Sequence, residues 1–139
     1  MPVLRLDSVI IKNMKQRKFS LYKRLHSFVY AFNGLRILLR EEHNARVHVF
    51  ISICVIVAGF VLEVSINEWL FLILSIGLVL TLEIINSSIE NISDFVSPEK
   101  HEKIKIIKDL SAAAVLVGAI TASVIGLLIF TPKILIYFQ

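Results

Sequence analysis

Three long apolar blocks, separated by short polar segments, fill most of the chain after residue 46. The first runs from Val47 to Leu62, and its polar interruptions are His48 and Ser52. The third runs from Ser111 to Phe130 without a charge, and Thr131-Pro132 is expected to end it because proline does not fit a helix interior. A helix needs about 20 apolar residues to cross a bilayer, so the pattern predicts a protein that crosses a membrane several times.

The second block is too short to cross by itself. It begins at Trp69, an aromatic residue typical of the membrane interface, and meets Glu83 fourteen residues later. A helix of about 20 residues must continue through Glu83 to about residue 89, which carries an acid into the hydrocarbon. We predict an all-α integral membrane fold within residues 43–134, with spans of about 46–63, 69–92 and 109–130.

Residues 19–42 precede these spans and have a different pattern. Six large apolar side chains recur every three or four positions and fall within an arc of about 80° on a helix; they are Leu21, Leu25, Phe28, Phe32, Leu35 and Leu39. The pattern predicts an amphipathic helix in the headgroup region, and packing of this face on another protein is the alternative. Residues 1–18 are basic without an apolar stripe and are predicted to form a mobile tail.

The distribution of basic residues assigns an orientation to the predicted spans. Ten Lys and Arg residues precede residue 47, none lies in the loop 63–68, four lie between residues 98 and 109, and Lys133 follows the last span. Cytoplasmic loops of membrane proteins carry the excess of basic residues. The N-terminus and the second loop are therefore predicted to be cytoplasmic, and the C-terminus to lie outside.

Composition argues against several classes of protein. Apolar residues make up 56% of the chain and the mean hydropathy is +0.77, against about 45–50% apolar in an average domain, so a soluble enzyme or a disordered chain is not expected. The net charge of +4 flanks the apolar blocks, where it suits anionic lipid better than nucleic acid. The single cysteine, Cys54, excludes disulfide frameworks and is expected to be a small core or lipid-facing residue.

Four polar side chains share one face of the second predicted span. On a helix they fall within an arc of about 80°; they are Glu83, Asn86, Glu90 and Asp94. An ionisable group at the centre of a membrane costs about 2.5–3.5 kcal/mol, so such groups generally mark a function or a pairing. Glu83 is deep enough to meet a lipid hydroxyl, and carboxylates near the headgroups suit Mg²⁺ with phosphate and water. Alternatively, Glu90 and Asp94 cap the helix or pair with lysines of the next loop.

Two further charged clusters lie at the same predicted boundary. Residues 40–46 (REEHNAR) join the amphipathic helix to the first span, and Lys108-Asp109 opens the third. The first cluster is alternatively a solvated turn, and Lys108 is alternatively an anchor that reaches the headgroups. The sequence contains no Gly-rich phosphate loop and no HExxH zinc pattern. Any nucleotide chemistry would therefore depend on Mg²⁺ held by carboxylates and on basic residues.

The third span carries a small residue at every fourth position, at Ala114, Gly118, Ala122 and Gly126. Small residues allow membrane helices to approach closely. Three helices make a thin bundle that would leave the acids of the second span poorly shielded. We therefore expect an oligomer.

The motif E-I-I-N-S-S-I-E-N-I-S-D from Glu83 to Asp94, followed by K-D-L-S-A-A-A-V-L from Lys108, resembles the prokaryotic diacylglycerol kinase family of small integral-membrane lipid kinases. S-F-x-Y-A-F-x-G, EEHNARVH and V-S-I-N-E-W-L-F resemble its undecaprenol kinase branch. The resemblance implies a homotrimer in the bacterial cytoplasmic membrane with shared cytoplasmic active sites. It also implies transfer of the γ-phosphate of ATP, with Mg²⁺, to a lipid alcohol, which is undecaprenol or alternatively diacylglycerol.

Matched by position, the resemblance implies roles for particular residues of this chain. Glu83 corresponds to the catalytic base and, with Arg36, to the lipid site, whereas Glu42 and Glu90 correspond to metal ligands. The residues that correspond to the nucleotide and phosphate site are Lys23, Arg24, Tyr30, Asn86, Asp94, Lys108 and Asp109. The family has an arginine near position 23, so either of the first two would serve.

Two interpretations without catalysis remain open from the residues themselves. Acids inside a small oligomeric bundle also suit a cation pathway. A small membrane adaptor would need none of the buried acids. Cation leak through liposomes that hold the pure protein, without ATP turnover, would favour the first.

Overall fold

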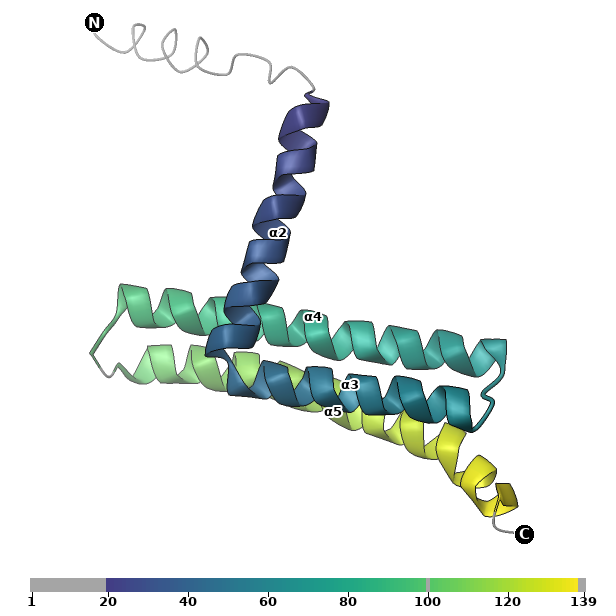
Figure 1. Ribbon diagram of the computed structural model, residues 1–139. Coiled ribbons are helices and arrows are strands. Elements are labelled where there is room, and N and C mark those ends of the chain that lie inside the picture. Colours follow the sequence, from purple (N-terminus) through teal and green to yellow (C-terminus); the bar gives the residue numbers. More distant parts are fainter. Residues whose placement is uncertain (1–19, 100, 138–139) are drawn as a thin grey trace, which may run out of the picture. The chain divides into compact units, whose positions relative to one another are not determined.

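The computed structural model describes the backbone of residues 20–99 and 101–137, and this part of the chain is helical without strands. Figure 1 shows α2 (Leu21–Glu41), α3 (His43–Val61), α4 (Ile66–Val96) and α5 (Glu102–Tyr137). The predicted basic tail, residues 1–18, lies outside the described residues. The prediction of an all-α fold is confirmed.

The chain divides into two units, residues 1–35 and residues 36–139. The described part of the first unit is the greater part of α2, where the large apolar side chains of Leu25, Phe28 and Phe32 are exposed. α2 lies within the range predicted for the amphipathic helix, and its place at a membrane interface stays a prediction. The second unit contains α3, α4 and α5.

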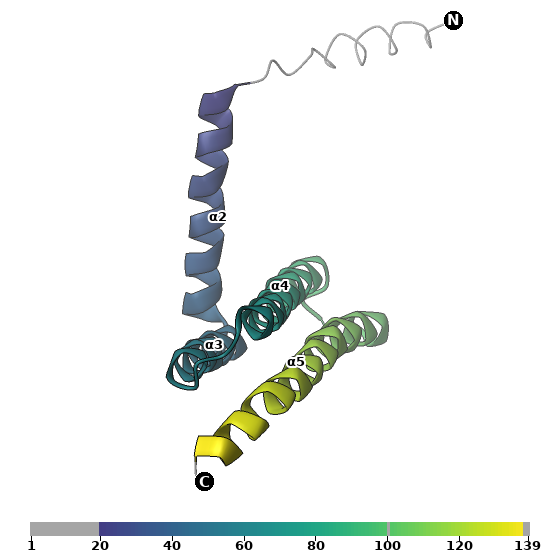
Figure 2. The ribbon, with the colours of Figure 1, turned by 90° about the vertical axis from the view of Figure 1, so that its right-hand side faces the viewer.

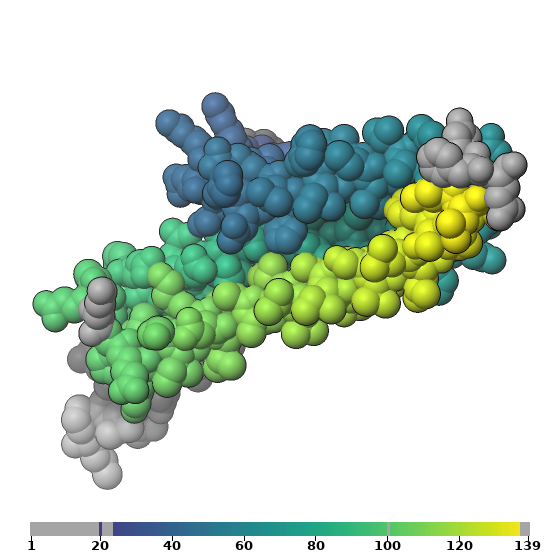
Figure 3. Space-filling model, turned by 90° about the horizontal axis from the view of Figure 1, so that it is seen from below, coloured from purple at the N-terminus to yellow at the C-terminus, as the bar shows by residue number. Residues whose placement is uncertain are grey.

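Helices α3, α4 and α5 are each long and apolar enough to cross a membrane. They contain 19, 31 and 36 residues and run side by side (Figure 1 and Figure 2). α4 packs against both α3 and α5, and Figure 3 shows one face of this bundle with α3 and α5 on either side of α4. Large apolar side chains are exposed along all three helices, as expected where the solvent is hydrocarbon. The prediction of three spans is confirmed.

Helix α4 does not stop where its apolar block ends. It continues past Glu83 and Glu90 to Val96, whereas the span was expected to end near residue 92. At about 1.5 Å per residue the helix is about 46 Å long, which exceeds the roughly 30 Å of hydrocarbon in a bilayer. One continuous helix therefore carries the polar face from the apolar interior to the membrane boundary.

The connection between α3 and α4 is a tight turn closed by backbone hydrogen bonds. Val64 N–H donates to the Gly59 carbonyl at 3.1 Å, and Glu63 N–H donates to the Phe60 carbonyl at 3.4 Å. Glu63 adopts a positive φ of 49°. This is the Schellman arrangement, in which one left-handed residue satisfies the last carbonyls of a helix.

Capping residues also start α4 at this turn. Ser65 and Glu68 form a reciprocal capping box. The turn buries Val64 in a cluster with Leu72 of α4 and Ile129 of α5. Apolar contacts thus join the three helices at this end of the bundle.

Helix α5 continues through Pro132 to residue 137, so the expectation that Thr131-Pro132 ends it is wrong. Proline leaves the Leu128 carbonyl without its helical donor and costs about 3 kcal/mol in a helix interior. Continuing the helix keeps the later backbone groups hydrogen-bonded within it. Lys133 also stabilises the continuation, because its Nζ lies 3.2 Å from the Glu68 carboxylate at the start of α4.

Candidate active site

The polar face of α4 is largely buried within its own chain. Glu83 is 2% exposed, Asn86 6% and Ser87 7%, while Glu90 is half-buried and Asp94 is exposed. Because the chain itself covers Glu83, the expectation that three helices leave the acids poorly shielded is wrong for this residue. The face therefore runs from the interior of the bundle to its surface.

A hydrogen bond joins an amide and a carboxylate on successive turns of α4. Asn86 Nδ2 donates to Glu90 Oε1 at 3.1 Å. Asn86 Oδ1 is buried and has no hydrogen-bond partner within the described part of the chain. An unpaired buried acceptor costs about 1–3 kcal/mol, so this oxygen is suited to a ligand that brings a positive charge or a donor.

Glu42 lies at the break between α2 and α3. Its backbone is extended, with φ −96° and ψ 118°, and it occupies the N-cap of α3 without making a side-chain capping bond. Instead, Glu42 Oε1 accepts a hydrogen bond of 2.9 Å from Ser87 Oγ of α4. The break therefore directs a carboxylate to the turn of α4 that carries Asn86.

Glu83 lies within electrostatic range of Glu42, His48 and Glu90. The predicted base and both predicted metal ligands are thus brought together, although they come from positions far apart in the sequence. The site is acidic, with three carboxylates around the buried end of the polar face.

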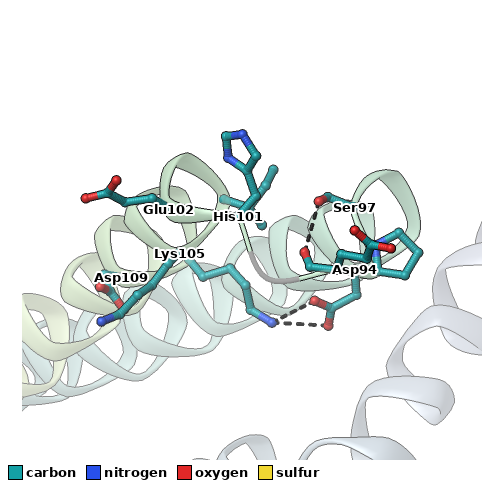
Figure 4. Close-up of a pocket in the computed structure, with 10 residues that line it drawn as sticks. Asp94, Ser97, His101, Glu102, Lys105 and Asp109 are labelled. Carbon is teal, nitrogen blue, oxygen red and sulfur yellow. Dashed lines mark hydrogen bonds and ion pairs between the residues drawn. The ribbon is translucent and has the colours of Figure 1, made fainter.

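A second group of polar side chains surrounds the connection between α4 and α5. Lys108 Nζ lies 2.9 and 3.1 Å from the two carboxylate oxygens of Asp94, which is the pairing that the sequence left as an alternative for Asp94. A pocket of about 680 Å³ opens beside this pair, and His101, Lys105 and Asp109 also line it (Figure 4). The lining therefore combines two lysines with four acidic side chains, so the pocket offers groups of both charges.

The remaining predicted residues belong to α2. Arg24 and Tyr30 are exposed in the first unit, where the Tyr30 ring lies edge-on to His26 with 5.7 Å between ring centroids. The side chain of Lys23 lies outside the described residues. Arg36 is exposed and belongs to the second unit. The roles of these four predicted residues stay predictions.

Oxygen donors around α4 suit a hard divalent cation that arrives with its own ligands. Among the described residues, no group of three or more His, Cys, Asp or Glu side chains could hold a metal by itself. Mg²⁺ is commonly held by one or two carboxylates together with phosphate oxygens and water. Glu42, Glu90 and the unpaired Asn86 Oδ1 fit that donor set.

Sequence reasoning missed two residues of this site, Ser87 and His48. For Ser87 the available signal was its place four residues after Glu83, one turn further along the same side of the helix. His48 was interpreted as a polar interruption of the first apolar block. In the structure it belongs to a stripe of α3 whose side chains are all buried or half-buried. The stripe recurs every three or four residues and consists of Ala45, His48, Ser52, Val55 and Gly59. That spacing was the signal that His48 faces the bundle and not lipid.

The fold and the site define an integral membrane enzyme suited to phosphoryl transfer, with carboxylates around a buried acid and a pocket of mixed charge nearby. Lys108 of the pocket is within electrostatic range of Glu90 of the carboxylate group, so the two polar regions are neighbours. Enzymes that transfer a phosphoryl group commonly use carboxylates to hold a metal ion, and the metal ion together with positively charged side chains binds the phosphates.

Comparison with known proteins identifies the family. The family model described as "Prokaryotic diacylglycerol kinase" matches residues 29–130. The undecaprenol kinase of Bacillus subtilis (strain 168) is 38% identical over 86% of this chain and 98% of its own length. Diacylglycerol kinases of Synechocystis sp. and Helicobacter pylori are 36% and 38% identical over 80% and 71% of this chain, and 64% and 78% of their own lengths.

The chain belongs to the prokaryotic diacylglycerol kinase family. It is a multi-pass membrane lipid kinase. Membership of this family points to metal-dependent transfer of a phosphoryl group to a lipid. The matched region contains every predicted site residue except Lys23 and Arg24.

Proposed function

We propose that this lipid kinase phosphorylates undecaprenol with ATP and Mg²⁺, giving undecaprenyl phosphate. The observation that carries the proposal is the match to the Bacillus subtilis undecaprenol kinase along 98% of that protein's length. Glu83 lies on α4, a helix long and apolar enough to cross a membrane, and this supports an acceptor that is itself dissolved in the bilayer.

The proposed reaction is a single in-line transfer. The lipid hydroxyl oxygen attacks the γ-phosphorus of ATP, the bond from that phosphorus to the bridging oxygen breaks, and ADP leaves with the bridging oxygen. Glu83 accepts the hydroxyl proton as general base. Glu42, Asn86 and Glu90 hold Mg²⁺, which when bound neutralises charge on the phosphate oxygens. Lys108 supplies a further positive charge beside them.

The pocket at the start of α5 is the proposed place of the nucleotide. Asp94, Lys108 and Asp109 line it, and its volume of about 680 Å³ lies within the roughly 300–1,000 Å³ of small-molecule pockets. Residues of α2 are also proposed to bind the two substrates. Tyr30 and either Lys23 or Arg24 would bind the nucleotide, and Arg36 would bind the lipid.

The membrane placement follows from the distribution of basic residues. Basic residues precede α3 and gather around the connection between α4 and α5, so both are proposed to be cytoplasmic and the C-terminus to lie outside the bacterial cytoplasmic membrane. We further propose a homotrimer with active sites shared between subunits. The large apolar side chains exposed on α3, α4 and α5 give such a trimer its contact surface as well as its contact with lipid. Nucleic acid is not a proposed partner.

Diacylglycerol is the second candidate acceptor, because relatives of similar identity are diacylglycerol kinases. Both lipids present one hydroxyl at the interface and differ in tail shape. Purified protein in mixed micelles with Mg-ATP should be offered both alcohols in competition. Faster phosphorylation of undecaprenol is expected, and a clear preference for diacylglycerol would overturn the proposed acceptor while leaving a lipid kinase.

The base role of Glu83 is tested by Glu83→Gln, which keeps the size of the side chain and removes its basicity. Loss of a general base should lower kcat by about 10²–10⁴-fold, with ATP affinity nearly unchanged. Glu63→Gln is the matched control, since Glu63 is exposed at the opposite end of the bundle. A near-normal kcat for Glu83→Gln would remove this residue from the base role.

A further inference from the structure

The hydroxyl of Ser87 forms an unusual bond for a serine inside a helix. Serine and threonine hydroxyls in helices commonly donate to the carbonyl one turn earlier. Five residues of α3, α4 and α5 do so here, each to the carbonyl four positions before it: Ser52, Ser75, Ser88, Thr121 and Ser123. Ser87 instead donates 2.9 Å across to Glu42, a residue 45 positions away.

Within the described part of the chain, the Glu42 carboxylate makes no hydrogen bond besides the one from Ser87. Glu42 sits between two helices in an extended conformation, and its carboxylate makes no capping bond with α3. A glutamate side chain at such a break has several rotatable bonds, and ordering a side chain of this kind costs up to about 1.5–2 kcal/mol of conformational entropy. The bond from a buried hydroxyl selects one orientation of the Oε1 atom.

Two adjacent residues of α4 thus each hold one glutamate. Ser87 holds Glu42 from the preceding helix break, and Asn86 holds Glu90 one turn further along α4. Each of these bonds engages one carboxylate oxygen and leaves the other oxygen of the same carboxylate for a ligand. The Oδ1 atom of Asn86 is buried and has no hydrogen-bond partner within the described part of the chain.

We infer that Ser87 is a positioning residue of this kinase, which orients Glu42 so that it can share a divalent cation with Glu90. The inference rests on the proposed role of Glu42 as a metal ligand. Ser87 itself does not contact the reacting atoms. Residues that hold metal ligands in place commonly contribute about 10- to 100-fold to metal affinity or activity.

Metal binding should be measured directly on the purified full chain in detergent. Mn²⁺ replaces Mg²⁺ because it is paramagnetic, and a non-hydrolysable ATP analogue is present. Electron paramagnetic resonance of free Mn²⁺ gives its Kd without turnover. Ser87→Ala should raise that Kd by about tenfold. The matched control is Ser88→Ala, because Ser88 is the neighbouring serine and its hydroxyl bonds only within α4, to the Ile84 carbonyl; its Kd should stay within twofold of wild type.

A double-mutant cycle separates positioning from general damage to the fold. In a Glu42→Gln background, which already lacks the charged ligand, Ser87→Ala should change the Kd by less than twofold. KM for the lipid should not change with Ser87→Ala, and far-UV circular dichroism should confirm that every variant is folded.

The outcomes distinguish this inference from the proposed function beneath it. A Kd within twofold of wild type for Ser87→Ala, with a weakened Glu42→Gln, would overturn the positioning role and leave Glu42 as a metal ligand. A normal Kd for Glu42→Gln would overturn the metal role of Glu42 and the inference with it. Equal effects of Ser87→Ala in both backgrounds would also overturn the inference, because the serine would then act independently of Glu42.

Discussion

Replacing Gly59 by alanine tests the contact that sets α3 against α4 at the end of the bundle opposite the site. A Cβ atom added at Gly59 would lie 2.7 and 2.9 Å from two carbons of the Trp69 ring, well inside the roughly 3.5–4.0 Å of a favourable carbon contact. Trp69 also contacts Phe60, with 4.9 Å between ring centroids, and packs against the buried cluster that contains Leu72. The rigid ring therefore has little freedom to move aside.

Two effects of opposite sign determine the size of the change. Alanine is favoured over glycine inside a helix by about 0.8–1.0 kcal/mol, whereas overpacking of this kind costs about 1–3 kcal/mol. The matched variant Gly77→Ala receives the first effect without the second, since nothing lies within 4 Å of its added Cβ. Gly59→Ala should therefore have a free energy of unfolding about 1–3 kcal/mol below that of Gly77→Ala.

The chain contains a single tryptophan, Trp69, so tryptophan fluorescence reports directly on the side chain that the substitution affects. Unfolding in dodecylmaltoside by added SDS should be followed by Trp69 fluorescence and, independently, by far-UV circular dichroism. Gly126→Ala is a second control, because its added Cβ also meets nothing within 4 Å. Equal unfolding midpoints for Gly59→Ala and Gly77→Ala would refute the close packing of Gly59 on Trp69.

Two ion pairs give contrasting predictions. Lys133→Ala removes the pair with Glu68 at the end of the bundle away from the site, so it should lower the SDS unfolding midpoint slightly and leave kcat unchanged; a large fall in kcat would contradict the placement of the site. Asp94→Asn leaves Lys108 without its 2.9 Å partner in the pocket, so the unfolding midpoint should hardly change because the pair is partly solvated. KM for ATP should nevertheless rise by about tenfold, because Lys108 loses the charge-assisted contact that holds it in the pocket. An unchanged KM would argue against this pocket as the nucleotide site.

Much of the fold follows from the distribution of apolar residues alone. The three spans, and the passage of the second through Glu83, could be predicted because a helix has to satisfy a fixed membrane thickness. The shared face of Glu83, Asn86 and Glu90 could be predicted from the helical repeat. These are local properties of one segment, and periodicity reports such properties well.

Contacts between segments could not be predicted in the same way. The bond from Ser87 to Glu42 depends on how α3 packs against α4, and the burial of Glu83 depends on which side of α4 its neighbours cover. The continuation of α5 through Pro132 is a further case, since local preference disfavours it whereas the ion pair of Lys133 with Glu68 favours it. In each instance an interaction between segments outweighed or escaped a local signal.

The polar end of α4 imposes a requirement that composition alone does not express. Asn86 and Ser87 are about 100° apart around the helix, so one of them can bond along α4 to Glu90 while the other reaches across to Glu42. Inserting one residue between Ser87 and Glu90 would rotate Glu90 by about 100° away from Asn86 and leave hydropathy nearly unchanged. The second span therefore does not accept polar residues at arbitrary positions. Its polar residues must keep their helical register, because Asn86 and Ser87, on a single turn, bond to two carboxylates from different parts of the chain.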